Sequence, residues 1–207
     1  GIRSWLTLLG IVIGVAVVVA LVFLGNGLKL AVMNQFGMSS TEIISVQAGG
    51  LNSFGPPGSG AANPLTTEDL EEIKKLSSVK KVIRRNIGSM QMEFESRSAI
   101  VFATNVPLDD RRFVYDFLGI EIENGRFFES GDSKKVVLGY NFFAGKTELG
   151  DKKISSGNRV FLNGERFDVV GITSRTGSFI TDNVVYLIDE DMEKLLGYGD
   201  EIDIIGV

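Results

Sequence analysis

The chain has 207 residues, 44% of them hydrophobic, and a mean hydropathy of +0.17. Its 26 acidic and 21 basic residues give a formal charge of −5, which argues against a nucleic-acid partner. It contains no Cys and no His, which excludes disulfides, thiolate metal sites, Cys nucleophiles and the usual general base.

The hydropathy is concentrated in residues 5–24, which carry no charge. A helix of that length spans roughly 30 Å, the thickness of a hydrocarbon core, while the remaining residues average about −0.1. One alternative is a buried core helix, but a charge-free run of this length is unusual for one. The other is a signal peptide, whose apolar stretch is usually shorter. We expect a retained transmembrane helix surrounded by lipid. Arg3 before it favours a cytoplasmic N-terminus and an outer part after about residue 25.

Two glycines in this run, Gly10 and Gly14, have the GxxxG spacing. That spacing lets two membrane helices approach closely, so both are candidates for helix packing. The alternative is that glycine is simply common in membrane helices.

Helical spacing continues beyond the apolar run. Leu24, Leu28, Val32 and Phe36 recur every four residues, and Gly37 is a candidate helix stop. We predict a stalk that extends the membrane helix outward by about three turns. An ordinary amphipathic helix packed on the outer domain would show the same spacing.

Short elements follow in the first part of the outer domain. Residues 42–47 predict a strand, and residues 48–64 form a loop rich in Gly and Pro. Thr66 is expected to cap a helix that runs to about residue 76. Met90, Met92 and Phe94 alternate with polar residues, which predicts one buried strand face; the strands expected here are 79–87, 90–95 and 99–104.

The second part is rich in strands. Asn163-Gly164 predicts a type I′ hairpin turn. We expect strands at residues 135–140, 159–163, 165–173, 183–188 and 201–207, and helices at 111–118 and 189–196.

This order of elements indicates an α+β fold with an inserted subdomain. The predicted divisions are the transmembrane helix and stalk (1–37), the first part of the outer subdomain (38–106), a β-rich insert (107–181) and the last part of the outer subdomain (182–207).

Two stretches come close to nucleotide-binding motifs. Gly139–Thr147 resembles a phosphate-binding loop, but five residues separate its glycines where the motif needs four. Val184–Glu190 resembles a strand that ends in magnesium-binding acids, a pattern that any strand before an acidic helix start produces. We therefore expect no nucleotide site.

The charge clusters indicate a solvent-exposed surface rather than a catalytic or metal-binding site. The acids of residues 68–72 and 189–191 stand at helix starts, where solvated carboxylates favour the dipole. The basic pairs at residues 80–81 and 84–85 are also expected to be surface charge. We expect no catalytic, cofactor-binding or metal-binding residue in this chain and do not predict an enzyme.

Several stretches, taken in chain order, resemble the MacB-like (FtsX-type) family of ABC-transporter permeases, specifically its first membrane helix and periplasmic core domain. They are RSWLTLLGIVIGV (3–15), VQAGG (46–50), PLTTEDL (64–70), ENGRFF (123–128), VVLGY (136–140) and FDVVGI (167–172).

The resemblance implies a porter-like α/β subdomain with an inserted Sabre-like one, in a permease of the inner membrane of which this chain is the first part. It implies coupling of cytoplasmic ATP hydrolysis to substrate export or extraction by mechanical transmission. The partners would be an ABC ATPase that holds ATP and Mg, a second permease copy, and in some systems a periplasmic adaptor. The rival interpretation is a ligand-sensing ectodomain anchored by a single membrane helix.

Overall fold

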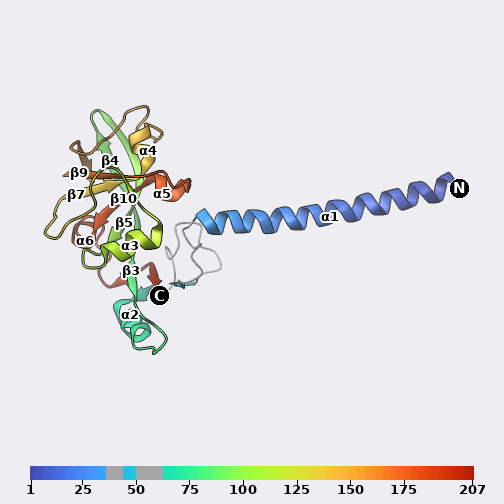
Figure 1. Cartoon of the computed structure of the whole chain (residues 1–207), viewed down its shortest axis with the longest axis horizontal. Helices are drawn as coiled ribbons and strands as arrows, with labels where there is room; N and C mark the ends of the chain where they lie inside the picture. The colour runs from blue at the N-terminus through green and yellow to red at the C-terminus, as the bar shows by residue number, and fades with distance from the viewer. Residues whose placement is uncertain (36–43, 50–62) are drawn as a thin grey trace. The chain divides into compact units, whose positions relative to one another are not determined.

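A computed structural model describes residues 1–35, 44–49 and 63–207 of the chain (Figure 1). The chain divides into two compact units, Gly1–Ser39 and Ser40–Val207. The first unit contains the N-terminal helix, and the second is the outer domain, which contains every strand described below.

The N-terminal unit is one long helix, α1 (Ile2–Gln35). Residues Ile2–Gly27 are long and apolar enough to cross a membrane, with a mean hydropathy of 3.0 and no part buried against the protein. The helix continues past this span to Gln35, as the four-residue spacing of apolar side chains predicts. The predicted stop at Gly37 lies outside the described residues.

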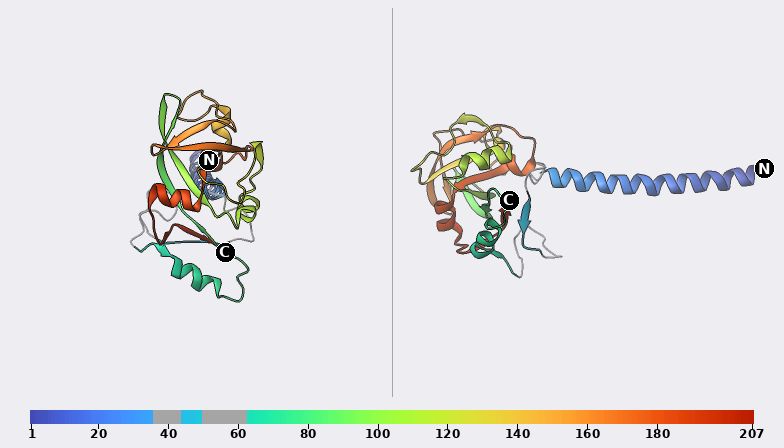
Figure 2. Two further views of the ribbon diagram at one scale, coloured as in Figure 1. Left: turned by 90° about the vertical axis from the view of Figure 1, so that its left-hand side faces the viewer. Right: turned by 60° about the horizontal axis from the view of Figure 1, so that its bottom comes forward.

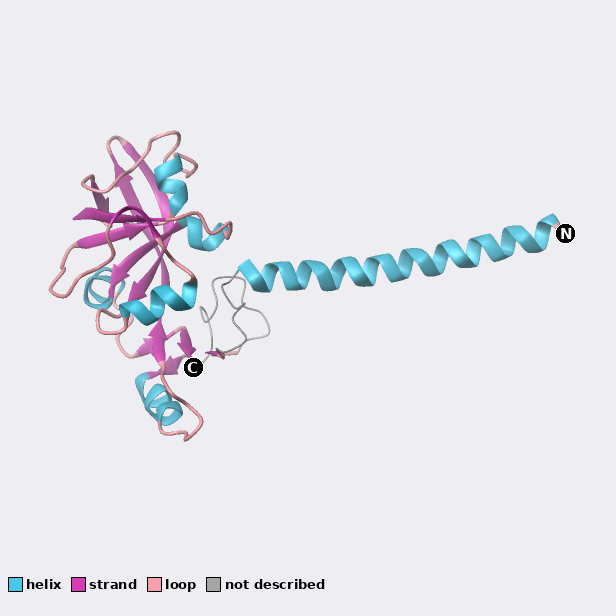
Figure 3. Ribbon diagram, viewed as in Figure 1, coloured by secondary structure: helices cyan, strands magenta, loops and turns pink. Residues whose placement is uncertain are grey.

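The outer domain combines short helices with strands, which form its centre (Figure 3). The helices are α2 (Thr67–Lys74), α3 (Arg111–Leu118), α4 (Tyr140–Ala144), α5 (Phe179–Asn183) and α6 (Asp189–Leu196). The strands are β1 (Ser45–Gln47), β2 (Leu65–Thr66), β3 (Ile83–Arg85), β4 (Ile87–Phe94), β5 (Arg97–Val106), β6 (Ile122–Gly125), β7 (Lys135–Leu138), β8 (Arg159–Leu162), β9 (Glu165–Thr173), β10 (Val184–Ile188), β11 (Glu201–Ile202) and β12 (Ile204–Gly206).

Seven strands form one mixed sheet in the order β6-β9-β7-β10-β5-β4-β8. Strand β8 also pairs with β9, so the sheet closes on itself like a barrel. The predicted alternation in β4 is confirmed, because Met90, Met92 and Phe94 are all buried. They belong to an apolar core to which each strand of the ring from β9 to β8 contributes.

A second core lies on the opposite face of this sheet, under helix α3. Val114 and Tyr115 of α3 pack with Tyr186 of β10 and Val106 of β5. The α3 helix ends at Gly119, whose positive φ of 60° allows the chain to turn back. Figures 1 and 2 show α2 at the opposite end of the outer domain from the β4 and α4 end of the large sheet.

A smaller sheet in the order β1-β12-β3 stands beside the large one. Beyond its last register pair, Ser45 with Gly206, the backbones of Ile44 and Val207 exchange two hydrogen bonds of 2.9 Å. The two ends of the described outer domain are therefore neighbours. Asn86 lies between β3 of the small sheet and β4 of the large one. Its Nδ2 donates a hydrogen bond of 2.8 Å to the carbonyl oxygen of Glu201 in β11.

The α+β class is confirmed, and so is the Asn163-Gly164 turn, whose residues have φ values of 47° and 81°. Helices α4 and α5 and strand β6 were not predicted, because a five-residue helix has fewer than two turns and β6 lacks the apolar run that marks β7 and β8. The division at residues 107 and 181 stays a prediction. Strands between those positions share one sheet with β4, β5 and β10.

Candidate functional site

The predicted helix-packing residues lie on an open helix surface. Gly10 and Gly14 are exposed, and a Cβ added at either would meet no described atom within 4 Å. This leaves room for a second helix at both positions. Packing through Gly10 and Gly14 stays a prediction.

The predicted stalk falls only partly within the described part of the chain. Leu24 lies on α1 with 69% of its surface exposed. Leu28 and Val32 also lie within α1, and Phe36 lies outside the described residues. The role of these residues as a stalk stays a prediction.

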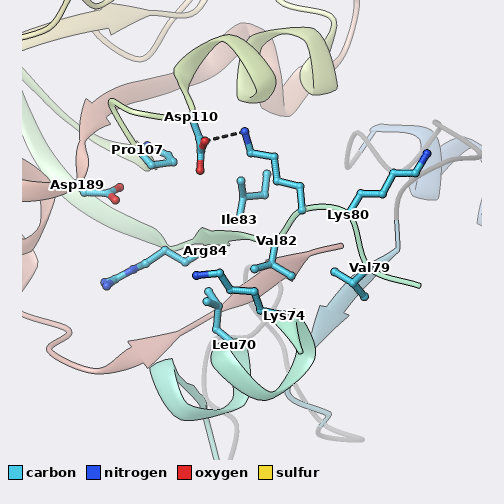
Figure 4. Close-up of a pocket in the computed structure, with 11 residues that line it drawn as sticks. Leu70, Lys74, Val79, Lys80, Val82, Ile83, Arg84, Pro107, Asp110 and Asp189 are labelled. Carbon is cyan, nitrogen blue, oxygen red and sulfur yellow. Dashed lines mark ion pairs between the residues drawn. The ribbon is translucent and has the colours of Figure 1, made fainter. Parts of the chain in front are cut away.

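In the outer domain, a cavity of about 420 Å³ lies between α2 and β3 (Figure 4). Its cations are Lys74 on α2, Lys80 and Lys81 before β3, and Arg84 on β3. Its apolar lining comes from Leu70, Val79, Val82, Ile83 and Pro107. The cavity is thus both cationic and apolar.

Two carboxylates also line this cavity. Asp110 forms an ion pair with Lys81, with 2.6 Å between Oδ1 and Nζ. Asp189 accepts a hydrogen bond of 2.6 Å from Nδ2 of Asn105. Burial raises the pKa of Asp189, while the bond from Asn105 opposes that rise.

The interpretation of residues 189–191 as a solvated helix face holds for the exposed Glu190 but is wrong for Asp189 and Asp191. Asp191 is only 1% exposed, and its Oδ2 accepts the backbone N–H of Lys134 at 2.7 Å. Because α6 follows the fully buried strand β10 without a loop, its first turn is held against the domain. The carboxylates of Asp189 and Asp191 act as acceptors for other segments. Burial raises the pKa of Asp191.

The surface interpretation is also wrong for Arg85. Its Nη2 donates to Oγ1 of Thr104 at 3.2 Å, and burial lowers its pKa. Its Nε is buried and has no hydrogen-bond partner among the described residues. Strand β3 points alternate side chains to opposite faces, so Arg84 and Arg85 meet different environments.

Three large apolar side chains of β5 and β8 are exposed on the outside of the barrel. Ile100 and Phe102 of β5 are 64% and 50% exposed, and Phe161 of β8 is 44% exposed. Strand β4 lies between them, with Gln91 opposite Ile100 and Glu93 opposite Phe161. These three side chains could contact another molecule, but as hydrocarbons they cannot act in catalysis or hold a metal ion.

The near-match to a phosphate-binding loop is explained by the fold. Gly139 follows strand β7 and is the N-cap of α4, and residues 140–144 form that helix instead of an open anion-binding loop. Among residues 1–35, 44–49 and 63–207, no group of three acidic side chains could hold a metal ion. The expectation that the chain needs no cofactor stays a prediction.

Comparison with known families gives the context for these features. The family model for the MacB-like periplasmic core domain matches residues 4–205. This chain belongs to the MacB-like periplasmic core domain family. The resemblance inferred from the sequence is therefore confirmed.

Relatives of this MacB-like chain include ABC transporter proteins. An uncharacterised ABC transporter permease of Methanocaldococcus jannaschii is 29% identical over 205 residues, covering 99% of this chain and 49% of the relative. The macrolide export ATP-binding/permease protein MacB of Campylobacter jejuni is 31% identical over 192 residues, covering 89% and 28%. The chain thus spans half or less of these relatives' length.

Solved structures confirm the MacB-like fold. The periplasmic region of MacB from Actinobacillus actinomycetemcomitans matches with a TM-score of 0.60 and 18% identity, over 81% of this chain and 74% of that one. The extracellular domain of the transporter YknZ matches with a TM-score of 0.56 and 16% identity, over 79% and 82%. The family match over residues 4–205, together with the apolar helix α1, supports a membrane-anchored ectodomain of an ABC transporter permease.

Three of the cavity cations, Lys80, Lys81 and Arg84, were expected to be surface charge, since they belong to no known motif. One signal could have indicated them: residues 73–92 contain six Lys or Arg and no Asp or Glu. In an acidic chain, such a stretch indicates a local electrostatic role.

Proposed function

We propose that this chain transmits movement from an ABC ATPase to a domain outside the inner membrane. In this function α1 crosses the membrane, the residues after about 25 are extracytoplasmic, and no reaction occurs in the chain itself. The membership in the MacB-like family supports a permease ectodomain over a sensor domain.

The pairing of Ile44 with Val207 is the observation that carries this proposal. It brings the two ends of the outer domain together, so a membrane segment that follows Val207 would leave the domain beside the segment that enters it. Movement of two membrane helices would then act on one place in the outer domain, the small sheet β1-β12-β3.

The partners in this proposal are an ABC ATPase that binds ATP and Mg, and a second permease copy whose helix packs at Gly10 and Gly14. A periplasmic adaptor is a further partner where transport continues through an outer membrane. Relatives named as macrolide export proteins make macrolides the first cargo to test.

The test uses the assembled transporter and needs no known cargo. Residues 1–207 contain no Cys, so once any Cys elsewhere in the transporter is replaced, Ser130→Cys on the exposed surface of the outer domain can carry one spin label per copy. We expect the distance between the two labels to change when ATP is added. Val32→Pro interrupts α1 at a cost of about 3 kcal/mol to the helix and should abolish that change while ATP hydrolysis continues.

Val32→Ala is the matched control, since it shortens the same side chain and keeps the helix. It should behave like the unmodified protein. An ATP-driven change that persists with Val32→Pro in a folded transporter would contradict transmission through α1.

A further inference from the structure

The cavity between α2 and β3 contains one cation and one carboxylate that can still bind a ligand. Nε of Arg84 donates to Oδ1 of Asn86 at 3.4 Å, and no described residue forms an ion pair with this guanidinium. Oδ1 of Asp189 accepts from Asn105 at 2.6 Å, while Oδ2 has no hydrogen-bond partner within residues 1–35, 44–49 and 63–207. Both side chains are half-buried and line the cavity.

A buried amide holds these two residues in place. Nδ2 of Asn105 donates to the carboxylate of Asp189 and, at 3.2 Å, to the carbonyl oxygen of Arg84. Asn105 is only 1% exposed. The guanidinium of Arg84 also lies over the ring of Tyr198, with 5.9 Å from Cζ to the centroid. Because these contacts exist before a ligand arrives, less conformational entropy is lost on binding.

Arg84 and Asp189 do not neutralise each other. They form no ion pair in the described structure, although Figure 4 shows both end groups on the same side of the cavity. Burial raises the pKa of Asp189, and the positive charge of Arg84 is among the effects that oppose this rise. A ligand with a negative and a positive group could therefore satisfy both residues at once.

The other charges of the lining compete little for such a ligand. Lys81 and Asp110 already form an ion pair of 2.6 Å with each other, and Figure 4 shows Lys80 directed away from the cavity. A simple anion would leave Asp189 without a partner, and a simple cation would leave Arg84 without one.

The rest of the lining suits an apolar group of limited size. Leu70 on α2, Val82 before β3 and Pro107 after β5 are half-buried and line the cavity. The volume of about 420 Å³ lies in the range of small-molecule sites. The ligand that matches this lining carries both charges close together on a short hydrocarbon side chain.

We propose that this cavity binds a zwitterionic α-amino acid with an apolar side chain. Arg84 binds the carboxylate, Asp189 accepts from the ammonium group, and Leu70 and Val82 contact the side chain. Arg84 belongs to β3 of the small sheet, whereas Asp189 directly follows β10 of the large sheet. A bound amino acid would therefore join the two sheets.

The test measures binding of L-leucine to the full chain in detergent by isothermal titration calorimetry. Leucinamide lacks the carboxylate, and isocaproate lacks the ammonium group. We expect each analogue to bind at least about tenfold more weakly than leucine, as loss of a hydrogen bond to a charged group predicts. Arg84→Gln and Asp189→Asn should weaken leucine binding to the same extent. Lys75→Gln, outside the cavity lining, should not change it.

Other outcomes overturn the proposal. Equal binding of leucine and isocaproate would mean a simple anion site, and equal binding of leucine and leucinamide would mean a simple cation site. A dissociation constant for leucine above about 10 mM would be weaker than a ligand of this size should show in a built site. If Arg84→Gln lowers the melting temperature, Asp189→Asn and the two analogues still decide the result. The measurement requires neither the ATPase nor transport.

Discussion

Gly139 lies directly against the backbone of Asp182. A Cβ on Gly139 would come within 2.5 Å of the carbonyl carbon and oxygen of Asp182. The N–H of Gly139 also donates to the carbonyl oxygen of Val184 at 2.9 Å. The turn from β7 into α4 is thus packed on the turn from α5 into β10, and both sides of this contact can be tested.

Gly139→Ala should destabilise the outer domain by about 1–3 kcal/mol, because the added methyl group meets backbone that cannot rotate away. The measurement is urea unfolding of the detergent-solubilised chain followed by circular dichroism. Gly49→Ala is the control, since a Cβ there meets no described atom within 4 Å. Equal stability of the two variants would refute the proposed close contact.

Asp182→Asn should cost about 2 kcal/mol, the scale of a lost hydrogen bond to a charged group. Oδ1 accepts from the N–H and hydroxyl of Thr176 at 2.9 and 2.8 Å, and Oδ2 accepts from the N–H of Gly177 at 3.0 Å. Asn has one acceptor oxygen, so its amide group would face at least one donor. Glu190→Gln removes the same negative charge at an exposed position and should leave the unfolding midpoint unchanged.

Asp189→Asn should stabilise the chain at neutral pH. Burial raises the pKa of Asp189, so the folded state binds its proton more tightly than the unfolded state and ionisation opposes folding. The Asn side chain can still accept from Asn105. The gain over the unmodified chain should therefore shrink as pH falls through the raised pKa; a pH-independent gain would disprove this origin.

Asp132→Asn should have the opposite effect on the stability of the chain at neutral pH. The hydrogen bond from Arg126 lowers the pKa of Asp132, with 2.8 Å between Nη1 and Oδ2. That carboxylate stabilises the fold above its unfolded pKa, and its contribution is lost as pH falls through the lower, folded value. The variant should be less stable at neutral pH, with a deficit that shrinks in acid.

Thr66→Ala should cost about 1 kcal/mol by removing the cap of α2. The N–H of Asp69 donates to Oγ1 of Thr66, and Oδ2 of Asp69 accepts the N–H of Thr66 at 2.8 Å. Thr67→Ala, one residue later and exposed, is the matched control and should be nearly neutral. Hydrogen exchange in the first turn of α2 distinguishes the two variants, and equal protection would contradict the capping role.

Patterns within a few residues predicted local structure well. Thr66 capped the helix it was expected to cap, α3 and α6 span the predicted residues, and the alternation in β4 marked the buried face. Each of these depends on neighbours along the chain. Ordered resemblances across the chain predicted the family, which the match over residues 4–205 confirmed.

The sequence by itself determined a charge-free span, the types of most outer elements and the MacB-like family. Only the tertiary structure decided which charges are buried, that strands from residues 87–188 close one sheet, and that Ile44 meets Val207. The physical reason is the distance along the chain. Asp191 receives its hydrogen bond from Lys134, and Asp189 receives one from Asn105. Before folding brings those donors close, an acid at a helix start has the same local pattern whether it will face water or a buried N–H.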